Sequence, residues 1–392
     1  MLLAIPTNEF KERQQNFARI IAERGCDSAV IYAVADIFYL TGFHFYPTER
    51  PIILFVDKQQ KYYLYVPSLE REHAEEYAVI DGVYDYLEYP SLTHPMITFA
   101  AVLKQHHFEG QTVGCDAAGY GSSMGYRGPA LAEVLTANYV SVKHIIEEMR
   151  FVKSPNEIEL IKESCRWGNL AHRLLQKYTK VGYSEIEVTS RASAEATLAM
   201  IETLGQDYKP HGDVGAHAIF RGQIGPESAF PHAVTQNIML QQGDTLVTGA
   251  GATVFGYHSE LERTMFVNEV SKDQEKYFQY MYEAQDVAFD NLKPGVTCSE
   301  VEQAVQNYFK EQGIQHLTRH HTGHNIGILG HEAPFLDVGD HTVIEPGMVF
   351  TIEPGIYVPG LGGFRHSDTV VITEDGMEML TYYPRDLASL IC

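Results

Sequence analysis

A strong helix start near the middle of the chain divides the sequence into two parts. Ser154 is a helix cap, Pro155 stands at the first helical position and Glu157 at the third, which together form a capping box. The chain has 392 residues, too many for one ordinary core and enough for two domains at a prior of roughly 150 residues each. We therefore predict one domain over residues 1–150 and a second over residues 151–392.

The first part alternates helical and strand patterns. An apolar helical face runs from Asn8 to Arg24, where Gly25 stops it, and a second predicted helix covers Met96–His107. Short apolar runs typical of strands make up the rest of the pattern, and these are Ser28–Tyr32, Ile52–Val56, Tyr62–Val66 and Thr112–Cys115. This alternation predicts a small α/β domain.

The second part contains a faint internal repeat. The segments 180–187 and 293–302 each close one helix, break it at a Lys-x-Gly step and open another helix with Ser-Glu-apolar-Glu. A match this short can arise by chance, but it favours two structurally related halves.

Charge and cysteine content limit the partners and the compartment. Lys and Arg number 29 against 51 Asp and Glu, so the formal net charge is −22, which repels phosphate backbones and anionic membranes. No stretch has the apolar length of a membrane span. We expect no nucleic-acid or membrane partner and a cytoplasmic location, because the cysteines are odd in number and form no disulfide framework or metal spacing: Cys26, Cys115, Cys165, Cys298 and Cys392.

Titratable residues gather on one predicted strand, residues 257–266. A period of two places His258, Glu260, Glu262 and Thr264 on the same face. Two carboxylates and an imidazole can bind a cation or a metal, or relay a proton. An exposed polar strand face is the alternative interpretation.

Further candidates stand before and after that strand. His232 lies in a segment flanked by Gly and Pro, and Glu353 closes an apolar strand, where an unpaired carboxylate would be costly. Residues 362–369 lead into another apolar strand. Glycines surround an unusually dense group of imidazoles that could lie near a ligand: His316, His320, His321, His324 and His331.

Taken together, these blocks resemble the aminopeptidase P, prolidase and creatinase family. The resemblance covers nearly the whole chain, including Tyr39–Phe43 and the Lys153-Ser154-Pro155-x-Glu157 entry to the second part. It implies an α+β fold in which a C-terminal "pita-bread" domain, a pseudo-twofold antiparallel sheet flanked by helices, follows a smaller N-terminal α/β domain.

The resemblance also implies where a metal centre would lie. Metal-dependent members hold two divalent ions with Asp, Asp, His, Glu and Glu, and a clamp of this kind needs carboxylates shared between the ions. The corresponding residues here are Gly249, Glu260, His324, Glu353 and Ser367. We therefore expect no metal cofactor, and if an ion binds, a single Mn, Zn or Fe ion on Glu260, His324 and Glu353.

The site residues are closest to the metal-free, creatinase-like branch of the family, because Leu261–Thr264 matches its Leu-Glu-Arg-Thr strand. By this resemblance His232 is the general acid/base, Glu262 and Glu353 grip the substrate, and His324 assists. Arg50 is expected to hold a substrate carboxylate across a homodimer interface. The remaining expected substrate contacts are His258, Glu260, His331 and His366.

Three functions remain open from the sequence. The one we favour is creatinase-like, metal-independent hydrolysis of an amide or amidine C–N bond in a small cationic or zwitterionic substrate. The second is an Xaa-Pro aminopeptidase or dipeptidase with at most one metal ion, and the third is a non-catalytic peptide-binding module. In the first two cases the partner is a small molecule or a dipeptide, and in all three we expect a homodimer.

Overall fold

The computed structural model describes residues 3–121, 124–211 and 215–392, which form two compact units. One unit is Ile5–Arg150, and the other is Phe151–Cys392, with which Leu3 and Ala4 are grouped. None of the helices in these described ranges combines the length and the apolar composition needed to cross a membrane.

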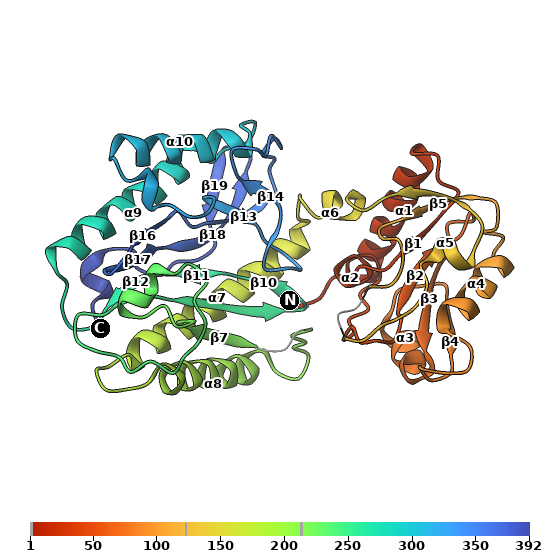
Figure 1. Cartoon of the computed structure of the whole chain (residues 1–392), viewed down its shortest axis with the longest axis horizontal. Coiled ribbons are helices and arrows are strands. Elements are labelled where there is room, and N and C mark those ends of the chain that lie inside the picture. Colours follow the sequence, from red (N-terminus) through yellow and green to blue (C-terminus); the bar gives the residue numbers. More distant parts are fainter. Residues whose placement is uncertain (1–2, 122–123, 212–214) are drawn as a thin grey trace. The chain divides into compact units, whose positions relative to one another are not determined.

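The unit of residues 5–150 is a six-stranded sheet with helices (Figure 1). Its strand order is β4-β3-β2-β1-β5-β6, with parallel and antiparallel neighbours mixed. The predicted helices at 8–24 and 96–107 are α1 and α4. The elements in chain order are α1 (Thr7–Glu23), β1 (Ser28–Ile31), α2 (Val34–Thr41), β2 (Ile53–Val56), β3 (Tyr62–Pro67), α3 (Arg71–Tyr77), β4 (Gly82–Tyr86), α4 (Pro95–Gln105), β5 (Thr112–Cys115), α5 (Leu131–Val134), β6 (Asn138–Ser141) and α6 (Ile145–Met149).

Two helix pairs belong to the unit of residues 151–392, and each pair has the construction that the repeat predicts. The first pair is α7 (Pro155–Tyr178) and α8 (Glu185–Leu204), and the second is α9 (Lys272–Asn291) and α10 (Cys298–Glu311). The predicted capping box is confirmed, since Ser154 Oγ accepts from the Glu157 amide and Glu157 accepts from the Ser154 amide. Ser184 and Thr297 cap α8 and α10 in the same way, through the amides of the residues three positions on.

An antiparallel nine-stranded sheet is the core of this unit (Figure 1). Its main path is β10-β9-β11-β18-β15-β13-β14, while β7 pairs with β9 and β19 with β18. The unit also contains two separate two-stranded sheets, β8–β12 and β16–β17. The strands are β7 (Ala216–Ile219), β8 (Thr245–Val247), β9 (Gly249–Val254), β10 (Tyr257–His258), β11 (Leu261–Glu262), β12 (Thr264–Phe266), β13 (Gly323–Asn325), β14 (Glu332–Leu336), β15 (Val349–Ile352), β16 (Gly355–Val358), β17 (Gly362–Arg365), β18 (Ser367–Thr373) and β19 (Gly376–Met379).

The prediction of one continuous strand over 257–266 is wrong. The segment forms three short strands because it changes partners along its length: β10 pairs with β9, β11 with β18 and β9, and β12 with β8. The period of two is therefore interrupted between His258 and Glu260, and the shared face that the sequence predicts does not hold across the break.

Candidate active site

Four neighbouring parts of the large sheet bring the candidate residues together. Glu260 precedes β11, Ser367 begins β18, Glu353 follows β15 and His324 lies in β13, and these strands are consecutive in the sheet. Cross-strand register fixes the arrangement, since Glu262 lies opposite Ser367. Residues more than a hundred positions apart in the sequence thus meet at one place.

His324 is the buried centre of this group. Its Nδ1–H donates to the Asn325 carbonyl at 3.0 Å, which fixes the ring and points Nε2 at two carboxylates. Nε2 lies 3.2 Å from Glu353 Oε1 and 4.0 Å from Glu260 Oε2, yet it has no aligned hydrogen-bond partner among the described residues. Burial lowers the pKa of this imidazole, but the charges of Glu353 and Glu260 outweigh it and raise the pKa to about 9.

The two carboxylates beside His324 differ in their electrostatics. Burial and the charge of Glu353 raise the pKa of Glu260 to about 7, although Ser367 Oγ donates a 2.7 Å hydrogen bond to its Oε1. Burial acts on Glu353 in the same direction, but His324 and Arg365 oppose it and lower the pKa of Glu353 to about 2. Glu353 is therefore ionised, and Glu260 can hold a proton near neutral pH.

Arg365 is the site residue that the sequence analysis missed. Its guanidinium binds both oxygens of Glu262 through Nη2 and Nε, with Nη2 at 2.7 Å from Oε1, and both side chains are buried. Its Nε also lies 3.7 Å from Glu353 Oε2. The sequence does contain an indication of this role. Arg365 stands in a segment that leads into an apolar strand, and an arginine buried there needs a carboxylate partner.

This pairing changes the expected role of Glu262. From the sequence we expect Glu262 to bind the substrate, but in the structure both of its carboxylate oxygens accept hydrogen bonds from Arg365. A polar chain continues from there, since Arg365 donates to the Tyr357 hydroxyl at 2.9 Å and Tyr357 in turn donates to His320 Nε2 at 2.7 Å. Glu262 thus neutralises Arg365 within the protein.

Two histidines from the sequence analysis lie at the exposed edge of the group. The ring of His331 stacks on His324, with centroids 3.8 Å apart and an interplanar angle of 21°. His232 is exposed and follows Pro231, whose carbonyl accepts a 3.5 Å hydrogen bond from Arg365. Both positions suit contact with a ligand that enters the site from solvent.

Other expected site residues have different surroundings. His366 is fully buried, with Nδ1 accepting from the Thr264 amide and Nε2 donating to the Arg385 carbonyl, so it does not fit the expected role as a substrate contact. His258 lies on the edge strand β10, with Nδ1 3.4 Å from Thr253 Oγ1. Arg50 belongs to the unit of residues 5–150, where it pairs with Glu49 and Glu88.

A two-metal centre does not fit these residues. Gly249 offers no ligand, and Ser367 directs its hydroxyl to Glu260. A Cβ built on Gly249 would lie 3.6 Å from Glu262 Oε1, so the missing side chain would have pointed into the site. One ion is compatible, because the unpartnered Nε2 of His324 lies 3.2 Å from Glu353 Oε1 and 4.0 Å from Glu260 Oε2, and ligand atoms of Glu260, His324 and His331 lie within 4.8 Å of one another.

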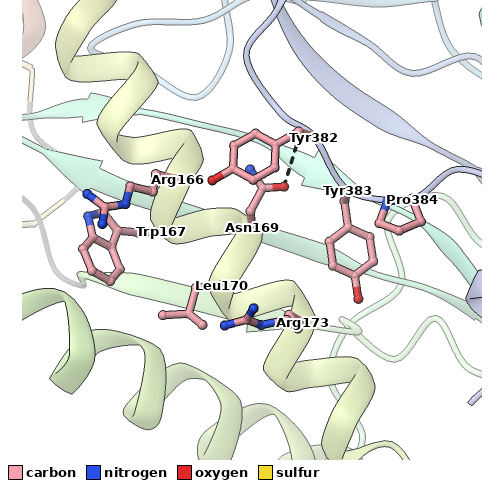
Figure 2. Close-up of a pocket in the computed structure, with 8 residues that line it drawn as sticks. All are labelled: Arg166, Trp167, Asn169, Leu170, Arg173, Tyr382, Tyr383 and Pro384. Carbon is pink, nitrogen blue, oxygen red and sulfur yellow. Dashed lines mark hydrogen bonds between the residues drawn. The ribbon is translucent and has the colours of Figure 1, made fainter.

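A hollow of about 380 Å³ along α7 is separate from this site (Figure 2). Figure 2 shows Arg166, Trp167, Leu170 and Arg173 of α7 facing residues 382–384, with the Tyr382 amide bonded to Asn169. None of the site residues predicted from the sequence lines it.

Comparison with known proteins places the chain. The model of metallopeptidase family M24 matches residues 159–374, and that of the creatinase/prolidase N-terminal domain matches residues 13–152. The chain therefore belongs to metallopeptidase family M24. This confirms the predicted family, the pita-bread fold and a hydrolase.

Relatives of similar length lie within this family. A Xaa-Pro dipeptidase of Pyrococcus horikoshii is 29% identical over 96% of this chain and 98% of its own length. A putative dipeptidase of Bacillus subtilis is 28% identical over 96% of this chain and 99% of its own. The solved structure of a Xaa-Pro dipeptidase from Bacillus anthracis is 25% identical, covers 96% of this chain and 99% of its own, and has a TM-score of 0.81.

Proposed function

We propose that this protein hydrolyses the amide C–N bond of a small zwitterionic substrate of dipeptide size. The observation that carries the proposal is the buried cluster of Glu260, His324 and Glu353, in which one carboxylate is ionised and the other titrates near pH 7. Two carboxylates with divergent pKa values supply an anion and a proton carrier at one place, which amide hydrolysis requires.

The relatives support a dipeptide as substrate. Proteins of nearly equal length and 28–29% identity are named as a putative dipeptidase and as Xaa-Pro dipeptidases. We therefore propose Xaa-Pro dipeptides as the first substrates to test. The relatives give no support to the amidine chemistry of the creatinase-like branch that the sequence analysis favours, and we do not propose it.

The acid–base chemistry follows from the positions of the side chains. Glu260 takes a proton from the attacking water, the new C–O bond forms at the carbonyl carbon, and the proton passes to the leaving nitrogen as the C–N bond breaks. Protonated His324 beside it steadies the negative charge that develops on the carbonyl oxygen. His232 and His331 at the edge are suited to contact the substrate.

A single divalent ion is compatible with this site. Glu260, His324 and Glu353 would hold it, and when bound it would polarise the substrate carbonyl as a Lewis acid. Cations of that charge suit a cluster in which three carboxylates, Glu260, Glu262 and Glu353, lie with oxygens within 4.8 Å of one another.

Metal-independent hydrolysis is the second candidate, and one observation favours it. Two resident cations, Arg365 and protonated His324, already balance the charges of Glu262 and Glu353 while Glu260 is protonated. At pH values below about 7 the charges of these five side chains therefore sum to zero without a bound metal ion.

The other finer expectations stay predictions. We propose a homodimer in which Arg50 reaches the neighbouring active site, and light scattering at micromolar concentration tests this, since a monomer would contradict it. A cytoplasmic location and the absence of nucleic-acid partners are likewise proposed, on the basis of the net charge of −22.

The direct test is a hydrolysis assay on the full chain. Xaa-Pro and non-proline dipeptides are offered in chelator, and again with Mn²⁺ or Zn²⁺ in place of chelator. We expect turnover of dipeptides, and loss of turnover in Glu353→Gln but not in the exposed Glu374→Gln control. Turnover only with added ion selects the single-metal mechanism, turnover in chelator selects the metal-independent one, and no turnover in either condition contradicts the proposal.

A further inference from the structure

Lys153 is a buried cation that the proposed chemistry does not use. It stands just after the start of the unit of residues 151–392, and its side chain is only 1% exposed. Its Nζ donates to Asn325 Oδ1 and lies 3.4 Å from Glu332 Oε2, whose side chain is also 1% exposed. A lysine is rarely buried to this extent unless it is paired, so the arrangement needs a reason.

Both partners of Lys153 follow a histidine of the candidate site in the chain. Asn325 comes directly after His324 and accepts the His324 Nδ1–H at its carbonyl. Glu332 comes directly after His331. Its Oε1 accepts a 2.9 Å hydrogen bond from the Leu329 amide, which helps to fix the loop between His324 and His331. One ammonium group therefore joins the backbone positions that carry the two stacked rings.

Gly327, in that connection, shows how closely the lysine is fitted. A Cβ at this position would lie 2.9 Å from Lys153 Cε and 3.1 Å from Glu332 Oε2. The backbone of Gly327 lies outside the left-handed region, so alanine is permitted there by the local conformation. The space beside Gly327 is thus taken up by the lysine stem and its carboxylate partner.

We propose that Lys153 is a positioning residue that holds His324 and His331 in their stacked arrangement. The proposal rests on the proposed function in one respect, namely that the two imidazoles act in the hydrolysis. A displacement of about 1 Å in a reacting group can lower the rate by about 10²-fold. In this role Lys153 acts through Asn325 and Glu332.

The test uses two variants of the full chain and one control. K153M/E332Q removes the ion pair without leaving a single buried charge, and G327A pushes on the same two side chains without changing any charge. V188A trims a fully buried side chain in α8 and serves as the control for a general loss of stability. The readouts are kcat and KM on a dipeptide, and amide hydrogen exchange of peptides covering 323–336 and 185–204.

We expect kcat to fall about 10²-fold in K153M/E332Q and less in G327A, with KM changed by no more than about threefold. Exchange should accelerate in 323–336 only, and in V188A it should accelerate in 185–204 while kcat is retained. Unchanged exchange over 323–336 in K153M/E332Q would overturn the proposal, as would a kcat loss that V188A reproduces at equal loss of stability. If the unaltered protein turns over no dipeptide, the proposed function fails, and the exchange measurement alone decides on the positioning.

Discussion

The two halves of the 151–392 unit are built alike but contribute different chemistry to the site. The first half, α7, α8 and β7–β12, provides Gly249, Glu260 and Glu262, whereas the second, α9, α10 and β13–β19, provides His324, Glu353 and Arg365. In the second half, His324 Nε2 lies 3.2 Å from Glu353 Oε1. In the first half, one position has no side chain and one carboxylate is neutralised by an arginine of the other half.

The site therefore draws its polar and charged side chains from both halves, and the two halves do not supply them equally. Gly249 offers no ligand, whereas His324 Nε2 and Glu353 Oε1 of the other half lie 3.2 Å apart. Arg365 of the second half links the two halves, because its guanidinium forms two directed hydrogen bonds with Glu262 of the first.

The largest effect is expected from the second half. Glu353→Gln removes the ionised carboxylate that favours the protonated form of His324, so we expect kcat/KM to fall by about 10³-fold, because the His324 charge stabilises the developing oxyanion. Steady-state kinetics on a dipeptide measures this. If Glu353→Gln stays within tenfold of the unaltered protein, the Glu353–His324 pair of the second half does not take part in the reaction as proposed.

The link between the halves gives the next effect. Glu262→Gln removes the carboxylate that forms two hydrogen bonds with the buried Arg365 guanidinium and leaves the more distant Glu353 Oε2, 3.7 Å from Nε, so we expect a loss of about 3 kcal/mol in the free energy of unfolding. Urea denaturation of the full chain measures it, with Glu187→Gln in the exposed Arg191 pair as control, for which we expect less than about 1 kcal/mol. Equal small losses in both variants would show that Glu262 does not neutralise Arg365.

A smaller effect concerns pH and the carboxylate of the first half. The pKa of Glu260 is raised to about 7 from 4.5, so the folded protein binds more protons than the unfolded chain between these values, and stability falls as pH rises through this window. We expect a contribution of about 1–3 kcal/mol in chelator-treated protein. Denaturation midpoints from pH 4.5 to 7 should show a slope that Glu260→Gln reduces, and an unchanged slope would place the titration elsewhere.

His324 adds a second window at higher pH. Its pKa is raised to about 9 from 6.5, so its stabilising charge is fully present below pH 6.5 and is lost as pH rises to about 9. In the Glu260→Gln variant the pKa of His324 should lie below about 9, because the Glu260 charge is one cause of its rise. The loss of stability with rising pH, followed by denaturation midpoints, should then end at a lower pH than in the unaltered protein.

Much of this architecture could be predicted from local sequence signals. The capping box at Ser154 and Glu157 marks the start of α7, and the repeat anticipates two helix pairs, because caps and helix breaks act within a few residues. The need of Glu353 for a partner also follows from its place at the end of an apolar strand, and the structure supplies His324 and Arg365.

Other features depend on contacts that no local pattern encodes. The division of residues 257–266 into three strands results from a change of sheet neighbours. The pairing of Arg365 with Glu262 depends on β18, which Arg365 precedes by two residues, pairing with β11 about a hundred residues away in sequence. His366 and Arg365 are adjacent, and only the tertiary structure shows which of them faces the site.

We propose that this member of the metallopeptidase family holds at most one metal ion, at Glu260, His324 and Glu353. Elemental mass spectrometry after incubation with Mn²⁺ and dialysis tests it most directly, with the variant G249D/S367E, which restores two carboxylates, as the comparison. We expect no more than one equivalent of Mn in the unaltered protein and a gain of one equivalent in the variant. Two equivalents in the unaltered protein would contradict it.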